Sequence, residues 1–207
     1  MHRVRGISGM PFRRIALAVF VLSASVLTGC ANFYVDPVLK DVSPADMNKI
    51  SAPKPVQLLF EFQTKGVQNS RATDRLRDQV IEQVKASGLF SIVDDKPVAE
   101  GAILSLTINN VPLTDDAAAK GFVTGLTLGL AGSQVSDGYV CTLKYIGPGG
   151  KDPIVKTERH VIHTVLGAKG APEGMTKSDN AEAAVRTMTK QIIGNALKDL
   201  SYDRSFK

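Results

Sequence analysis

Two of the three histidines, His160 and His163, lie three residues apart, a spacing that first suggests metal chemistry. On a helix, this spacing would place both imidazoles on one side, where they could bind a single ion. In a strand, residues three apart point to opposite faces, so one ion cannot bind both. The surrounding residues favour a strand, and no Cys or carboxylate stands at ligand spacing. The sequence therefore predicts no metal site at this pair.

Other catalytic arrangements are also missing from the sequence. It has no G-x-S-x-G turn for a nucleophilic serine and no glycine motif for a phosphate or a dinucleotide. The acidic pairs Asp94-Asp95 and Asp115-Asp116 lie in turn-like contexts, where neighbouring carboxylates are usually solvated. We therefore expect a protein that is not an enzyme and needs no cofactor. A hydrolase is disfavoured because no nucleophile–base pair is apparent.

The chain has two cysteines, Cys30 and Cys141, in different contexts. Cys141 lies in a strand-like alternation with no His, Lys or Arg beside it, which predicts a buried, unreactive thiol. Cys30 ends a segment with the three parts of a secretory signal. A basic stretch closes at Arg13-Arg14, an apolar run follows from Ile15 to Leu27, and small residues precede the cysteine. Such a run rises only ~20 Å as a helix, short of the ~30 Å of a bilayer core, so a signal is favoured over a transmembrane span.

The residues Leu27-Thr28-Gly29-Cys30 resemble the lipobox of bacterial lipoproteins. The resemblance implies cleavage before Cys30, a diacylglyceryl thioether on its sulfur, and acylation of the freed amine. It predicts residues 1–29 to be a lipoprotein signal peptide, starting at Met1 or at Met10. In these lipoproteins an aspartate after the cysteine retains the protein at the inner membrane. Because Ala31 follows here, the resemblance implies an outer-membrane protein that faces the periplasm and is held by its N-terminal lipid.

The net charge of +5 depends largely on this signal. Residues 1–29 contain four arginines and no acidic residue, so 21 of the 25 basic side chains remain against 20 acidic ones. A balance near +1, with no Trp and few other aromatic residues, gives no support to nucleic-acid binding.

A glycine-rich apolar segment at residues 117–132 is the most unusual part of the chain. Its glycines repeat every four residues, and large apolar residues follow beside them. On a helix, this pattern makes a groove for close backbone approach. Two interpretations stay open: a crossover buried against the sheet, or a surface that contacts a partner or the membrane. The candidate contact residues are Gly121, Phe122, Gly125, Leu126, Gly129 and Leu130.

The rest of the mature chain predicts a lipidated flexible tether followed by one domain. Four prolines interrupt residues 30–55, and no periodicity appears there. From residue 56 to residue 207, alternating and helical patterns give the order β-α-β-β-β-β-α. The predicted strands cover residues 56–62, 89–93, 102–111, a strand before the glycine-rich turn at 147–153, and 154–166. The predicted helices cover 70–87, capped by Asn69 or Ser70, and 180–200, with a start resembling a capping box at Asp179 and Glu182.

Both helices have one apolar stripe, which predicts an α+β two-layer sandwich. Its sheet is mainly antiparallel, both helices cover one face, and the other face is partly open. With its lipobox, the chain resembles small periplasmic lipoproteins: the activators of penicillin-binding proteins, the lipopolysaccharide-assembly lipoprotein and the curli-secretion lipoprotein. The resemblance implies a non-enzymatic accessory protein that binds a periplasmic or outer-membrane protein partner. A periplasmic carrier or sensor of an apolar or glycan ligand is the alternative.

Overall fold

The computed structural model describes residues 31–113, 134–150, 152–166 and 174–206. In this part of the chain the helices are α2 (Ser70–Ala86) and α4 (Ala181–Ser201), with a short 3-10 helix η2 (Pro44–Asp46). The strands are β1 (Ala31–Val35), β2 (Lys54–Thr64), β3 (Val67–Gln68), β4 (Phe90–Asp94), β5 (Ala102–Pro112), β6 (Gln134–Ile146), β7 (Ile154–Leu166) and β8 (Thr176–Ser178).

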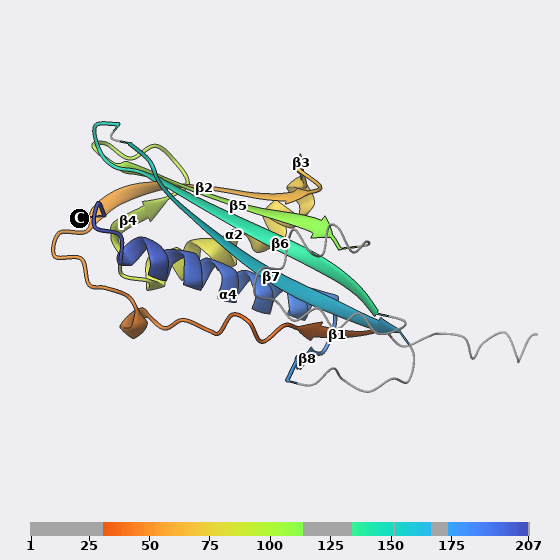
Figure 1. Cartoon of the computed structure of the whole chain (residues 1–207). Helices are drawn as coiled ribbons and strands as arrows, with labels where there is room; N and C mark the ends of the chain where they lie inside the picture. The colour runs from red at the N-terminus through yellow and green to blue at the C-terminus, as the bar shows by residue number, and fades with distance from the viewer. Residues whose placement is uncertain (1–30, 114–133, 151, 167–173, 207) are drawn as a thin grey trace, which may run out of the picture. The chain divides into compact units, whose positions relative to one another are not determined.

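These strands form one mixed sheet in the order β3-β2-β5-β6-β7-β1-β8, and β4 pairs with β2 beside that path. The pairs β2–β5 and β2–β4 are parallel, because α2 carries the chain back across the sheet between them. All other pairs are antiparallel. Figure 1 shows both helices on the same side of the sheet, α2 beneath β2 and α4 beneath β6 and β7. The predicted α+β fold is confirmed.

The main core lies between this helix layer and the sheet. Alternate residues of β2, β5 and β6 enter it, among them Leu58, Leu106 and Leu143, as the period of two predicts. Both helices contribute their apolar stripes, and Gly88 ends the α2 segment at a φ of +69°. Asn69 caps α2 as expected, its side chain accepting a hydrogen bond from the Ala72 N–H.

The start of α4 differs from the prediction. Asn180, and not Asp179 with Glu182, is the N-cap, and its side chain accepts a hydrogen bond from the Ala183 N–H at 2.9 Å. An asparagine satisfies a free N–H of the first turn as well as an aspartate does, so the sequence left the choice between these neighbours undecided.

The prediction of a flexible tether over residues 30–55 is wrong for its described part. Ala31–Val35 forms β1, which pairs with β7 on one side and with β8 on the other. Residues 37–50, the strap, then run along α4 (Figure 1) and bond to it: Lys40 O accepts from Asn195, and Asn48 N–H donates to Ser201. The residues from Ala31 onward form one compact unit. The segment is ordered by contacts with distant residues, which its own prolines do not prevent.

Among the described residues, neither helix combines the length and the apolar character needed to cross a bilayer. The outer sheet face, away from the helices, is partly open as expected: Leu59 and Val155 are exposed on it. The chain's C-terminal end is held at one end of the sheet, where Phe206 packs edge-on against Phe90 and Tyr145.

Candidate functional site

The site residues expected from the sequence lie outside the described part of the chain. This holds for Cys30, for the six candidate contact residues between Gly121 and Leu130, and for the acidic pair Asp115-Asp116. Their roles therefore remain predictions, and the site is built here from the residues that the structure describes.

A groove with a volume of about 540 Å³ crosses the helix layer between α2, α4 and the strap. Gly194 of α4 brings the helix close to the strap: a Cβ there would lie 3.3 Å from the Val42 Cβ and 3.4 Å from the Gln83 Nε2. The groove is lined by Val42, Pro44, Met47, Gln79, Glu82, Gln83, Ala86, Ser87, Arg186, Thr187 and Lys190.

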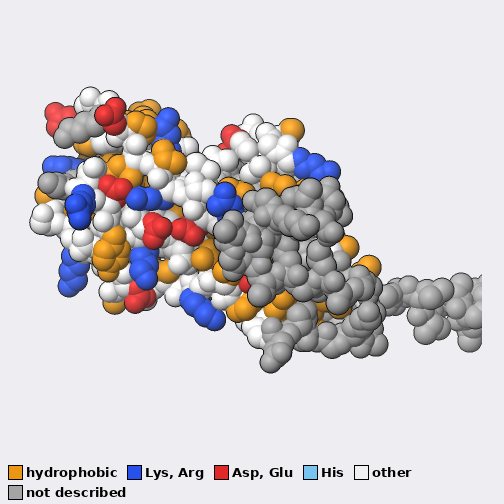
Figure 2. Space-filling view, viewed as in Figure 1, with side chains coloured by type: hydrophobic (Ala, Val, Ile, Leu, Met, Phe, Trp, Pro, Cys, Tyr) orange, Lys and Arg blue, Asp and Glu red, His pale blue; other side chains and the backbone are white. Residues whose placement is uncertain are grey.

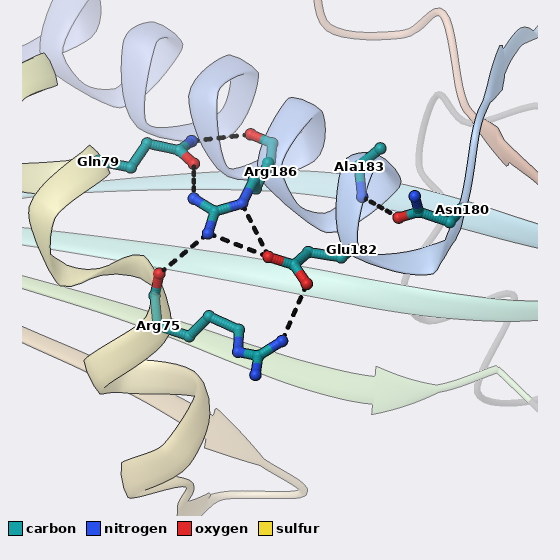
Figure 3. A network of polar contacts seen from close by, with 6 residues as sticks. All are labelled: Arg75, Gln79, Asn180, Glu182, Ala183 and Arg186. Carbon is teal, nitrogen blue, oxygen red and sulfur yellow. Dashed lines mark hydrogen bonds and ion pairs between the residues drawn. The ribbon is translucent and has the colours of Figure 1, made fainter.

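Polar groups hold the two helices together beside this groove (Figure 3). Arg186 Nη2 donates to Glu182 Oε1 at 3.1 Å, and Glu182 also accepts from Arg75 at 2.9 Å. Gln79 donates to the Arg186 carbonyl oxygen at 2.9 Å and accepts from the guanidinium at 3.3 Å. Hydrogen bonds from Arg186, with the charge of Arg75, hold the pKa of Glu182 below its usual value. Because these ion pairs are solvent-exposed, they orient the side chains more than they stabilise the fold.

The groove offers apolar contact together with charges of both signs. Val42, Met47 and Ala86 supply the apolar surface, while Glu82 and Lys190 stand beside them. Gln83 donates to the Lys190 carbonyl oxygen at 2.6 Å, but its own Oε1 is buried with no hydrogen-bond partner among the described residues. Apolar area surrounded by polar groups is the composition of many protein-binding surfaces.

Charges on the visible surface are mixed in the same way. In Figure 2, blue and red side chains alternate with hydrophobic ones over the described part of this face, without a large area of one sign. The balanced charge predicted for the mature chain is therefore spread out on this face, and no basic stripe of the kind that binds nucleic acid is visible on it.

A buried chain of three polar residues was not found by sequence reasoning. Ser136 of β6 lies 2.8 Å from His163 Nδ1, and His163 Nε2 lies 3.2 Å from the Asp36 carboxylate. An ionised carboxylate only accepts, so His163 Nε2 donates to Asp36; in the neutral ring Nδ1 then accepts from the Ser136 hydroxyl. Although burial alone raises the pKa of Asp36, hydrogen bonds from His163 and the Val38 N–H bring it below its usual value.

This arrangement contains a hydroxyl, a base and a carboxylate, the groups of nucleophilic catalysis. A nucleophile, however, must reach its substrate. The three side chains are at most 2% exposed. What the contacts do in this structure is join the segment after β1 to β6 and β7. No signal in the sequence could have found them, because the three residues are far apart along the chain.

The other histidine has a different environment. His160 Nδ1 accepts from the Val161 N–H at 2.9 Å, so Nε2 carries the proton and donates to Gln191 of α4 at 2.7 Å. Burial lowers the pKa of His160, which favours the neutral form. The two imidazoles therefore contact different elements, as the strand alternation predicted. Within the described ranges, no three His, Cys, Asp or Glu side chains gather as a metal site.

Two further expectations were confirmed. Cys141 is fully buried, and burial raises the pKa of its thiol to about 12. The pair Asp94-Asp95 is exposed where β4 ends, and the Asp94 carboxylate accepts from the Lys96 N–H at 2.9 Å.

Comparison with known proteins gives structural likeness only. No family model and no curated protein matches the chain. A PelC variant, solved as a dodecamer from Paraburkholderia phytofirmans, is 11% identical, with 84% of this chain and 98% of that chain covered and a TM-score of 0.31. An uncharacterized protein is 14% identical, with 75% and 94% covered and a TM-score of 0.35. A protein described as a neuraminyllactose-binding hemagglutinin homolog from Helicobacter pylori is 13% identical, with 80% and 92% covered and a TM-score of 0.33. At these values the likenesses do not bear on what this chain binds.

Proposed function

We propose that this protein is a lipid-anchored, non-enzymatic accessory protein of the outer membrane that faces the periplasm and binds an envelope protein partner. The observation that carries the proposal is the complete signal ending in Leu27-Thr28-Gly29-Cys30. Cleavage before Cys30 would leave a lipidated cysteine at the N-terminus of the folded domain. Two or more acyl chains, each contributing ~0.8 kcal/mol per buried CH₂, give stable anchoring.

The anchor is tested by comparing the two cysteines. Cys30→Ala removes the acyl acceptor, so the protein should leave the membrane fraction or accumulate with its signal uncut. Cys141→Ala is the matched control, because it removes the other thiol from a buried site and should leave fractionation unchanged. Mass spectrometry of the mature N-terminus identifies the acyl chains directly. A Cys30→Ala protein that matures normally and still partitions into detergent would refute the lipoprotein assignment.

The groove between α2, α4 and the strap is the surface where we place the partner. Its apolar residues are few and its charges mixed, which suits a protein segment with its own polar groups better than a purely apolar molecule.

A photo-crosslinking residue at Ala86, an exposed position lining the groove, tests this placement in cells. It should give a discrete adduct with one envelope protein, and Ala86→Arg should abolish copurification of that protein. The control position is Thr157, exposed on the outer sheet face, where the same probe should give no adduct. Adducts of equal yield at both positions, or copurification that survives Ala86→Arg, would exclude the groove as the partner site.

A carrier or sensor of an apolar or glycan ligand is the second candidate. The groove volume of about 540 Å³ favours it, since small-molecule sites commonly span about 300–1,000 Å³. Native mass spectrometry of the purified domain separates the two functions. A carrier retains a small molecule that Ala86→Arg displaces and gives no protein adduct; a partner-binding protein shows the reverse.

A further inference from the structure

The distance between the proposed lipid and the folded domain is set by β1. Its first residue, Ala31, follows Cys30 directly and pairs with Leu166 at the end of β7. Consecutive Cα atoms lie 3.8 Å apart across a trans peptide. Since β1 is held by β7 on one side and β8 on the other, no free spacer separates the cysteine from the sheet. An acylated Cys30 therefore brings this end of the sheet to the lipid surface.

Three strands end together at this place. Ala31 pairs with Leu166, and Gln134, where β6 begins, pairs with Val165. Two large apolar side chains are exposed here, Val135 and Leu166, each with 47% of its surface accessible. We call Ala31, Val135 and Leu166 the anchor end.

Charge is distributed unequally between the two ends of these strands. Residues 31–35, 134–136 and 160–166 contain no Asp, Glu, Lys or Arg, and the exposed charges next to β1 among the described residues are Lys177 of β8 and Asp179, which follows β8. At the other end, around the turn between β6 and β7 and the start of β2, exposed charges are numerous. They are Lys54, Asp94, Asp95, Lys96, Glu100 and Asp152.

This difference in charge indicates which end of the strands can lie at a lipid–water interface. Bringing an ionised side chain out of water carries a large free-energy penalty, whereas exposed Val and Leu gain from contact with acyl chains. The uncharged strand ends, with Val135 and Leu166 exposed, match a lipid surface; the many acidic and basic residues of the opposite end match water.

We propose that the anchor end lies against the lipid headgroups, with β6 and β7 directed away from the membrane. This rests on the proposed lipidation of Cys30. A 13-residue strand such as β7 rises ~40 Å, so the turn at 147–153 is held well into the aqueous space.

The test uses the full-length, lipidated protein in vesicles of phosphatidylethanolamine and phosphatidylglycerol. A small environment-sensitive fluorophore is attached at Val135→Cys or Leu166→Cys, and at Glu100→Cys or Asp152→Cys as matched exposed controls. Cys141 is fully buried and does not compete for the label. We expect lipids carrying a quencher at headgroup depth to quench the fluorophores at 135 and 166, and to leave those at 100 and 152 unquenched.

A linker variant tests the role of the direct connection. A copy of Ala-Asn is placed directly after Cys30, so that the residues read by the sorting machinery are unchanged. About twelve Gly/Ser residues, with a root-mean-square length of ~20 Å, follow this copy and precede Ala31. The lipid and the membrane fractionation should persist, while quenching at 135 and 166 is lost.

The orientation alone is overturned by a lipidated protein whose labels at 135 and 166 remain in water, or by equal quenching at both ends. Quenching at 135 and 166 that survives the linker shows that the strand ends bind lipid by themselves, and overturns the claim that the direct connection places them.

If mass spectrometry finds no lipid on Cys30, both the anchor and the orientation are wrong. If labels at 135 and 166 are shielded without lipid quenching, a second copy or a protein covers this end instead, and the orientation is overturned.

Discussion

At the scale of single residues, the buried polar contacts of β6, β7 and the segment after β1 are made between segments that lie far apart in the sequence. Asp36, Ser136 and His163 are ordinary residues in the sequence, and each becomes part of a buried chain of hydrogen bonds only through the pairing of β1, β6 and β7. By contrast, the burial of Cys141 was predictable, because the alternation around it is local. Local patterns therefore indicate which face a side chain takes, and the register of distant strands decides its partners.

Glu158 gives the residue-scale prediction. It lies in β7 beside Asp199 of α4, and burial, a hydrogen bond to Asp199 and the charge of Asp199 raise the pKa of Glu158 to about 7. The folded-state pKa is thus above the unfolded value near 4.5. The stability that Glu158 contributes is fully present below about pH 4.5 and is lost as pH rises through about 7.

Glu158→Gln removes this titration. We therefore expect the free energy of unfolding of the variant to rise relative to that of the wild type as pH is raised. Chemical denaturation at about pH 5 and about pH 8 measures the difference. Asp199→Asn is the companion variant, because it removes the neighbouring charge that raises the pKa of Glu158. It should therefore also weaken the loss of unfolding free energy between the two pH values. The raised pKa would be contradicted if Glu158→Gln and the wild type differed in unfolding free energy by the same amount at both pH values.

At the scale of elements, the segment before β2 shows where sequence reasoning reaches its limit. The two helices and the strands β2, β4, β5, β6 and β7 carry apolar patterns, so their order along the chain was predicted. Residues 31–50 carry none, and they become a strand and a strap through β7, β8 and α4. Free energy from such long-range contacts overrides weak local preference. The short strands β3 and β8 were missed for the same reason.

Gly194 tests the strap. A side chain at this buried position would press on Val42 and Gln83, whose nearest atoms would lie 3.3 and 3.4 Å from the added Cβ. We expect Gly194→Leu to lower the free energy of unfolding by ~1–3 kcal/mol, as overpacking does. Ala181→Leu, at an exposed position of the same helix, is the control and should change stability little. Thermal melting of the domain starting at Ala31 is the measurement. Equal melting temperatures for Gly194→Leu and the wild type would show that the strap moves away from the added side chain at no cost in stability.

At the scale of the whole molecule, one residue belongs both to the proposed sorting signal and to the folded domain. Ala31 is both the residue after the proposed lipidated cysteine and the first residue of β1. Its side chain is exposed, so the fold tolerates a different residue while the sorting signal changes.

We therefore predict that Ala31→Asp moves the protein to inner-membrane fractions in a host that uses the aspartate rule, with an unchanged melting temperature. Membrane fractionation and thermal melting are measured on the same preparation. Ala31→Ser, which is neutral, should remain in the outer membrane. An Ala31→Asp protein that is folded, lipidated and still in the outer membrane would contradict the sorting inference.

The pairing of β1 also orders events in time. Strand β1 needs β7 and β8, which come late in the sequence, so in a chain exported as proposed above it would stay unpaired until most of the chain has crossed. Nonlocal pairings of this kind form late in folding. The proposed cleavage and acylation at Cys30 would then take place before β1 has entered the sheet. Once β1 enters the sheet, Ala31 and Asn32 pair with β7, and Phe33–Val35 pair with both β7 and β8, so the backbone after the proposed cleavage site is no longer unpaired.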